Sequence, residues 1–167
     1  MSGQEGSENK ECPPFAKVMV EYFNDSLEVS FNIIQHMVHD NLALLSKISE
    51  ERSADWICDV KEELGRADEI CNIALNILNR EMLPSLIKDS DIKKSAGDLR
   101  VAAQELWYVH EDLKKLLQKG DDEKLARDAV GSAAAARDKL ETMLSIMIGS
   151  ISISAAELKN YGYVSRR

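Results

Sequence analysis

The chain has 167 residues, of which 44% are hydrophobic, 5% aromatic and 30% charged. This composition excludes a disordered chain, a collagen or proline-rich fibre, and a small disulfide-stabilised protein. The 21 basic and 29 acidic residues give a net charge of -8, which opposes binding to the phosphates of nucleic acids. The prolines are Pro13, Pro14 and Pro84, and the long proline-free stretches between and after them favour an all-α fold.

The N-terminal residues 1–12 are rich in Gly, Ser, Glu and Asn, and we predict that they form a disordered lead. They contain no apolar segment of the kind found in signal peptides. A first helix is predicted over about 15–48, because Pro13 and Pro14 can open a helix and apolar residues then recur at helical spacing. Asn41 interrupts this apolar series. It either fixes the register between helices or is simply a hydrogen-bonded core side chain.

A second helix is predicted over about 53–83. Ser49 or Ser53 is expected to cap its N-terminus, and Pro84 is expected to end it. The helix has a regular apolar seam formed by Ile57, Val60, Leu64, Ala67, Cys71, Ala74 and Leu78. Since Cys71 lies on this seam, we expect its thiol to be buried and unreactive.

A third helix is predicted over about 90–119, with Ser90 as its cap and Gly120 at its C-terminal end. A fourth helix follows almost at once, over about 122–160. The connection is so short that these two helices must lie side by side and antiparallel. The inward residues of the fourth helix are small between Ala126 and Ala136 and large after Ala136.

Four helices with short connections predict an antiparallel up-down-up-down four-helix bundle over residues 13–160, followed by a short tail at 161–167. Residues 146–153 also alternate with period two, so a small hairpin is the alternative to helix there. Trp56 and Trp107 are expected at the core or its edge, opposite small residues.

The three histidines, His36, His39 and His110, fall in one layer of this predicted bundle, and Glu63 and Glu111 lie within one turn of that layer. Imidazole and carboxylate ligands on facing helices can bind a metal ion in a bundle. The alternative is that the histidines serve no metal. The chain lacks the Glu-x-x-His pairs of ferritin-like proteins, and we predict no cofactor.

The segment Lys61 to Asp68, with the sequence Lys-Glu-Glu-Leu-Gly-Arg-Ala-Asp, resembles the Glu-Glu-Leu-Gly-Asp segment of the MazG-like all-α NTP pyrophosphohydrolases. The resemblance implies carboxylates that hold magnesium against substrate phosphates. Arg66 stands where that family has its Asp, and no Glu-Glu-x-x-Glu motif precedes the segment. Other catalytic motifs, such as a Gly-rich phosphate loop, Cys-x-x-Cys or a nucleophile elbow, do not occur, which favours a protein that is not an enzyme.

Two runs, Ile70 to Leu78 and Met143 to Ile153, are apolar almost all the way round their helices. Because one core uses only one stripe of each helix, the surplus predicts an exposed patch. We expect this patch to contain Ile73, Ile77, Ile146, Ile148 and Ile153. Covering of the patch by residues 161–164 is the alternative.

These patterns together predict a helical bundle that acts through protein contact, with a second copy of itself as a homodimer or with another helical protein as partner. A magnesium-dependent pyrophosphohydrolase and a metal-binding bundle are the alternatives. The odd number of cysteines fits a reducing compartment, so we expect a cytoplasmic location. The most apolar run is about half the length that spans a bilayer, so no membrane partner is expected.

Overall fold

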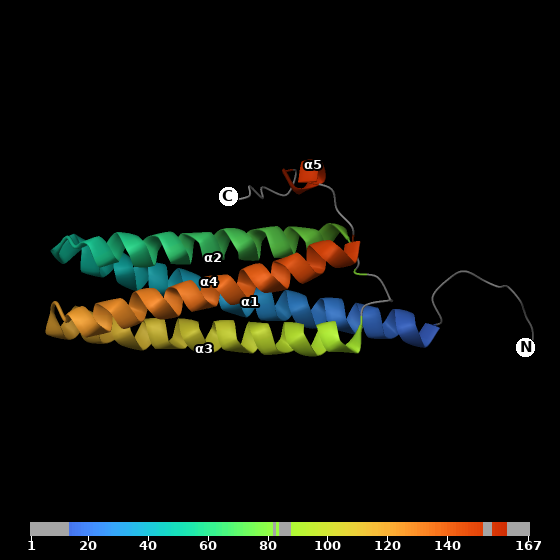
Figure 1. Cartoon of the computed structure of the whole chain (residues 1–167), viewed down its shortest axis with the longest axis horizontal. Helices are drawn as coiled ribbons and strands as arrows, with labels where there is room; N and C mark the ends of the chain where they lie inside the picture. The colour runs from blue at the N-terminus through green and yellow to red at the C-terminus, as the bar shows by residue number, and fades with distance from the viewer. Residues whose placement is uncertain (1–13, 82, 84–87, 152–154, 160–167) are drawn as a thin grey trace, which may run out of the picture.

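The computed structural model describes residues 14–81, 83, 88–151 and 155–159. Its helices are α1 (Pro14–Glu51), α2 (Asp55–Arg80), α3 (Asp89–Lys119), α4 (Glu123–Ile151) and the short α5 (Ala155–Leu158). The described residues form no strand, and α1 to α4 pack together as a bundle (Figure 1). The predicted all-α four-helix fold is therefore confirmed. The expected disordered lead and C-terminal tail lie outside the described residues.

The helix ends differ from the predicted ones in their capping. Ala54, in extended conformation, is the N-cap of α2 and makes no side-chain cap hydrogen bond. The predicted cap is therefore wrong for Ser53 and for Ser49, which lies within α1. Lys88 is the N-cap of α3, and its carbonyl accepts from the amides of Asp91 and Ile92, both at 3.0 Å. Ser90 therefore lies inside the helix rather than at its cap.

Helix α4 continues to Ile151, so residues 146–151 do not form the alternative hairpin, and 152–154 lie outside the described residues. The helix is shorter than the predicted 122–160, because α5 is a separate element. Of the described helices, none has an apolar stretch long enough to cross a bilayer.

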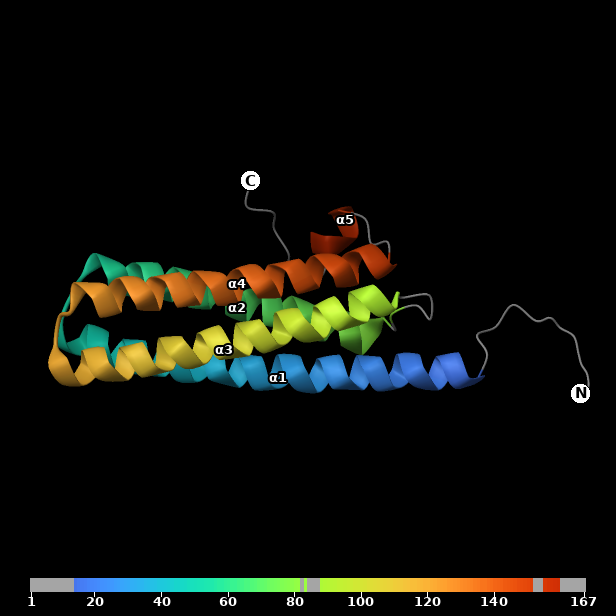
Figure 2. The ribbon, with the colours of Figure 1, turned by 60° about the horizontal axis from the view of Figure 1, so that its bottom comes forward.

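The four long helices are arranged in the order α1, α2, α4, α3 around the bundle. Helix α1 packs against α2 and α3, and α4 packs against the same two helices. Within the described residues the backbone of α1 does not come close to that of α4, nor does the backbone of α2 come close to that of α3. The bundle is thus made of two helical hairpins, α1–α2 and α3–α4, lying side by side (Figures 1 and 2).

Successive helices run in opposite directions, but two of the four neighbouring pairs are parallel (Figure 2). Asn41 Nδ2 donates to the Leu106 carbonyl across a separation of 65 residues, and Arg52 donates to the Leu116 carbonyl across 64. A constant separation means that α1 and α3 run in the same direction. The ion pairs between α2 and α4 likewise span 74 and 75 residues, so these helices are parallel too.

The two hairpin turns meet at the same end of the bundle. Arg52, just after α1, forms an ion pair of 3.3 Å with Asp121 in the α3–α4 turn. Gly120 ends α3 with a φ of 87°, a left-handed conformation that glycine adopts without strain, which confirms its predicted role. Asp122 caps α4 by accepting from the amides of Lys124 and Leu125 at 3.1 and 3.2 Å.

The core contains residues from all four long helices. In α4 the predicted sequence of small and then large residues is confirmed, because its buried residues are Ala126, Ala129, Ala133, Ala136, Leu140, Met143, Leu144 and Met147. Trp56 is partly buried against the core, as predicted. Trp107 is 53% exposed, so its expected core position is wrong. Leu106 and Val109 take the inward positions, and Trp107 points away from them.

Candidate functional site

The three histidines of the predicted metal site do not point toward one another. His36 is exposed on α1. His39 Nε2 lies 2.7 Å from Asp68 Oδ1 on α2, which binds the ring on the α1–α2 side of the bundle. The ring of His110 stacks on Trp107 of its own helix, with ring centroids 6.4 Å apart.

The two glutamates of the metal hypothesis are also engaged elsewhere. Glu63 forms an ion pair of 3.2 Å with Arg137 of α4, and Glu111 lies 3.8 Å from Lys114. No group of three or more His, Cys, Asp or Glu residues in the described part of the chain is placed to hold a metal ion. The predicted site at these five residues is therefore wrong, because sharing a level along a bundle does not bring side chains to one point.

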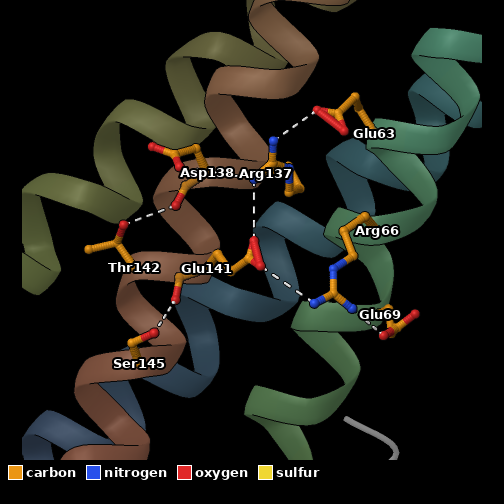
Figure 3. Close-up of polar contacts among 8 residues, drawn as sticks. All are labelled: Glu63, Arg66, Glu69, Arg137, Asp138, Glu141, Thr142 and Ser145. Carbon is orange, nitrogen blue, oxygen red and sulfur yellow. Dashed lines mark hydrogen bonds and ion pairs between the residues drawn. The ribbon is translucent and has the colours of Figure 1, made fainter. Parts of the chain in front are cut away.

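A chain of ion pairs joins α2 to α4 in its place (Figure 3). Glu63 pairs with Arg137, and Arg137 pairs with Glu141 at 3.3 Å. Glu141 then lies 3.4 Å from Arg66, which also pairs with Glu69 at 2.5 Å. Arg66 is the most buried member, with its side chain only 2% exposed. Charges alternate along this chain, so each carboxylate faces a guanidinium.

These ion pairs explain what the segment resembling the pyrophosphohydrolases does in this fold. Glu63 and Arg66 both bind α4 rather than an open cleft. Burial alone would lower the pKa of Arg137, but the hydrogen bonds and charges of Glu63 and Glu141 raise it above its ordinary value. The guanidinium therefore keeps its charge and holds both carboxylates between the helices.

The predicted apolar patch is wrong at Ile73 and Ile77, which are 1% and 0% exposed. Helix α2 has two neighbours, α1 and α4, and consequently buries a second stripe beside its main seam. Ile146 and Ile148 are half-buried, and Ile153 lies outside the described residues, as do residues 161–164.

A different surface exposes apolar side chains. Tyr22, Val29 and Ile33 of α1 are 71%, 58% and 55% exposed, and Trp107 of α3 is 53% exposed. These are four of the five large hydrophobic side chains that the described residues expose. The three residues of α1 are seven and four positions apart, so they form one stripe along the helix.

The stripe on α1 lies on the side of α3. Ile34 is buried in the core, and its neighbour Gln35 donates to Asp68 and Asn72 of α2 at 3.0 and 2.7 Å. Consecutive residues of a helix are rotated by about 100° around the helix axis. Gln35 and Ile33 are therefore rotated by equal angles from Ile34, in opposite directions. Because α1 packs only on α2 and α3 among the described helices, that direction leads to α3.

Trp107 lies on the matching side of α3. Its neighbour Leu106 is buried, and Glu105, on the other side of Leu106, lines a groove shared with α4. By the same rotation of about 100° per residue, Trp107 is turned toward α1. We call the surface formed by Tyr22, Val29, Ile33 and Trp107, together with the exposed charged residues between and beside them, the α1–α3 face.

The α1–α3 face was not predicted from the sequence, although a signal for it exists. Tyr22 and Val29 follow the apolar seam positions Val20 and Leu27 by two residues, which places them on the far side of the helix. Large apolar residues in that position have no core to enter. The sequence alone does not show that the stripe continues onto α3, because the neighbour of α1 was unknown.

The groove between α3 and α4 has a volume of about 440 Å³. It is lined by Glu105, Tyr108, Asp112, Arg127, Asp128, Gly131 and Ser132. Partial burial, and then the charges of Asp128 and Glu111, raise the pKa of Asp112 above its ordinary value, although Lys115 acts in the opposite direction. Since partial burial and the neighbouring carboxylates both disfavour the ionised form of Asp112, its negative charge destabilises the folded protein at neutral pH.

We expect Asp112→Asn to raise the melting temperature at neutral pH and to have no effect below pH 3.8, the ordinary pKa of the group. The folded protein binds this proton more tightly than the unfolded chain does. Its contribution to stability is therefore complete at low pH and lost as the pH rises through the folded-state pKa. Thermal denaturation at both pH values measures the effect. Asp59→Asn, at an exposed position on α2, is the control, and an equal gain in both variants would contradict the prediction.

Two cysteines lie in the described residues, and only Cys58 is exposed. Burial, and then the charge of Asp68, raise the pKa of the Cys71 thiol to about 12. Cys71 is therefore protonated at neutral pH, and its predicted burial on the seam of α2 is confirmed.

Comparison of the chain with protein-family models, with curated proteins and with solved structures finds no match.

Proposed function

We propose that this protein acts through protein contact and that the α1–α3 face is its contact surface. The observation that carries the proposal is the concentration of exposed Tyr22, Val29, Ile33 and Trp107 on one side of the bundle. Aromatic and aliphatic side chains at the centre of such a surface are typical of binding sites on proteins, because partner binding removes them from water.

The other sides of the bundle support this choice. On the α1–α2 side, Gln35 and His39 make polar contacts between the two helices. On the α2–α4 side, Arg66 and Arg137 do the same. The α3–α4 side has a groove lined mainly by polar and charged residues. Burial by a partner therefore removes more apolar surface from water on the α1–α3 face than on the other sides of the bundle. The exposed thiol of Cys58 favours a reducing compartment, and we propose the cytoplasm.

Site-specific photocrosslinking in cells tests the contact surface. A photoreactive amino acid replaces Ile33 in one variant and Glu62, an exposed residue of α2, in the matched control. We expect a protein adduct from position 33 and none from position 62. The adduct should disappear when Val29→Asp is added, because a charge then enters the apolar stripe. Equal yields at both positions, or an adduct that survives Val29→Asp, would contradict the proposal.

A further inference from the structure

We infer that the partner on the α1–α3 face is a second copy of this chain, related by a two-fold axis parallel to the helices. In this arrangement α1 of each copy lies over α3 of the other. The inference rests on the proposed function and adds the identity and orientation of the partner. It is carried by the distribution of charge within the face and by the register between α1 and α3.

Within the face, the two helices carry net charges of opposite sign. On α3, Lys93, Arg100, Trp107 and Lys114 are all exposed and each is seven residues from the next, so they form a mainly basic stripe with one aromatic residue. Lys114 of this stripe pairs with Glu111 at 3.8 Å. On α1, the exposed Asp25 lies between Tyr22 and Val29, and the exposed Asp40 follows Ile33 by seven residues. The exposed Lys47, seven residues after Asp40, is a basic residue on the same side of α1. The chain is acidic as a whole, so a basic stripe beside an acidic one is a local departure from its average charge.

A surface of this kind is complementary to itself, which is the requirement for a two-fold dimer. Two identical faces can meet in two ways. A two-fold axis perpendicular to the helices places α1 on α1, and it places α3 on α3, where the basic stripes meet. An axis parallel to the helices places α1 on α3, so that Asp25 and Asp40 meet the basic stripe. The basic charge of α3 therefore favours the parallel axis.

The register between the helices brings these charges to similar levels. The hydrogen bond from Asn41 to the Leu106 carbonyl sets residues of α1 level with residues of α3 that are 65 positions later. Rotation about an axis parallel to the helices leaves these levels unchanged. Asp25 of one copy then lies within one turn of Lys93 of the other. Asp40 lies between the levels of Arg100 and Trp107. Lys47 lies within one turn of Lys114, whose charge is paired with Glu111 of its own helix.

The size of the face is adequate for a dimer. Lys93 and Lys114, the ends of the basic stripe, are 21 residues apart. At a rise of about 1.5 Å per residue the stripe is roughly 32 Å long, and two adjacent helices of about 10 Å diameter are roughly 20 Å wide. Each copy thus offers on the order of 640 Å², which approaches the roughly 800 Å² per partner of a standard stable interface. A dimer of moderate affinity is expected.

Charge reversal at Asp40 and Arg100 tests both the partner and the orientation. Sedimentation velocity of the purified full chain should show a dimer in equilibrium with monomer. Asp40→Lys and Arg100→Asp should each raise the dissociation constant at least about tenfold, because each places like charges at both symmetric contacts. An equimolar mixture of these two variants should dimerise within about threefold of the wild type, since in the mixed dimer both contacts again join opposite charges. Glu62→Lys, on the exposed side of α2, is the matched control and should dimerise like the wild type.

Each chain in the mixture still carries its own substitution, so a folding defect caused by either substitution would persist there. Restored dimerisation in the mixture therefore reports the contact between the two copies. If the wild type dimerises but the mixture does not, the proposed orientation is overturned. If the wild type is a monomer at its highest soluble concentration, the second copy is not the partner. In that case, a photocrosslinked adduct from position 33 whose mass is not twice that of the chain would still support the α1–α3 face as the contact surface, with a different protein as partner. Absence of any such adduct would remove both proposals.

Discussion

Replacement of Arg66 by Ala is expected to lower the free energy of unfolding by about 3 kcal/mol. The Arg66 side chain is 2% exposed, and its guanidinium lies between Glu69 of its own helix and Glu141 of α4. Its removal leaves the partly buried Glu141 with Arg137 alone and removes the packing of a long side chain between the helices. Urea denaturation followed by circular dichroism at neutral pH measures the loss.

Three further variants separate the causes of this loss. Lys61→Ala, at an exposed position of α2, is the control and should change the free energy of unfolding by less than about 0.5 kcal/mol. Arg66→Met keeps much of the apolar length without the charge and should recover part of the stability. A double-mutant cycle with Glu141→Gln should give a coupling of about 1 kcal/mol. Equal losses for Arg66→Ala and Lys61→Ala would show that the ion pairs do not hold α2 to α4.

Replacement of Ala133 by Leu is expected to cost about 2 kcal/mol, because extra methylenes in a filled core force neighbouring side chains and helices apart. Ala133 is completely buried, and α3 and α4 make the most extensive contact of any two helices in the described residues. The run of small residues in the first half of α4 allows this close approach. Thermal and urea denaturation both report the change.

Ala135→Leu is the matched control, since Ala135 is only half-buried and lies two residues away on the same helix. It should cost less than about 0.5 kcal/mol, because Leu is nearly as good a helix former as Ala. Losses of the same size at both positions would contradict the prediction, because they would show that the cost does not come from close packing at Ala133.

Much of the local architecture was predictable, because the signals for it lie close together in the chain. Apolar spacing placed α1 to α4 within a few residues of their ends, except at the C-terminal end of α4. Gly120 marked the turn into α4, and Asn41 marked a buried polar contact, which the structure shows to be a hydrogen bond to the Leu106 carbonyl. Each of these depends on the residue itself and on its neighbours within one or two turns.

The candidate site was not predicted, and the reason is geometric. Ile73 and Ile77 were assigned to the surface because one helix was taken to bury one stripe, whereas α2 buries two. The histidines were placed at one level, but the level of a residue says nothing about the direction of its side chain around the helix axis. Trp107 was assigned to the core for the same reason. In every case the missing information was which helix lies on which side.

The amino-acid sequence was sufficient for the fold class, for the helix boundaries other than the C-terminal end of α4, and for the small-to-large change along α4, because periodicity, turn residues and side-chain volume act over short distances. It was not sufficient for the order α1, α2, α4, α3 around the bundle or for the parallel register of α1 with α3. That order depends on which of several similar amphipathic faces meet, and many long-range contacts contribute to it at once. It buries Arg66 between two helices and leaves Tyr22, Val29, Ile33 and Trp107 on one exposed face, so the proposed function follows from the tertiary arrangement.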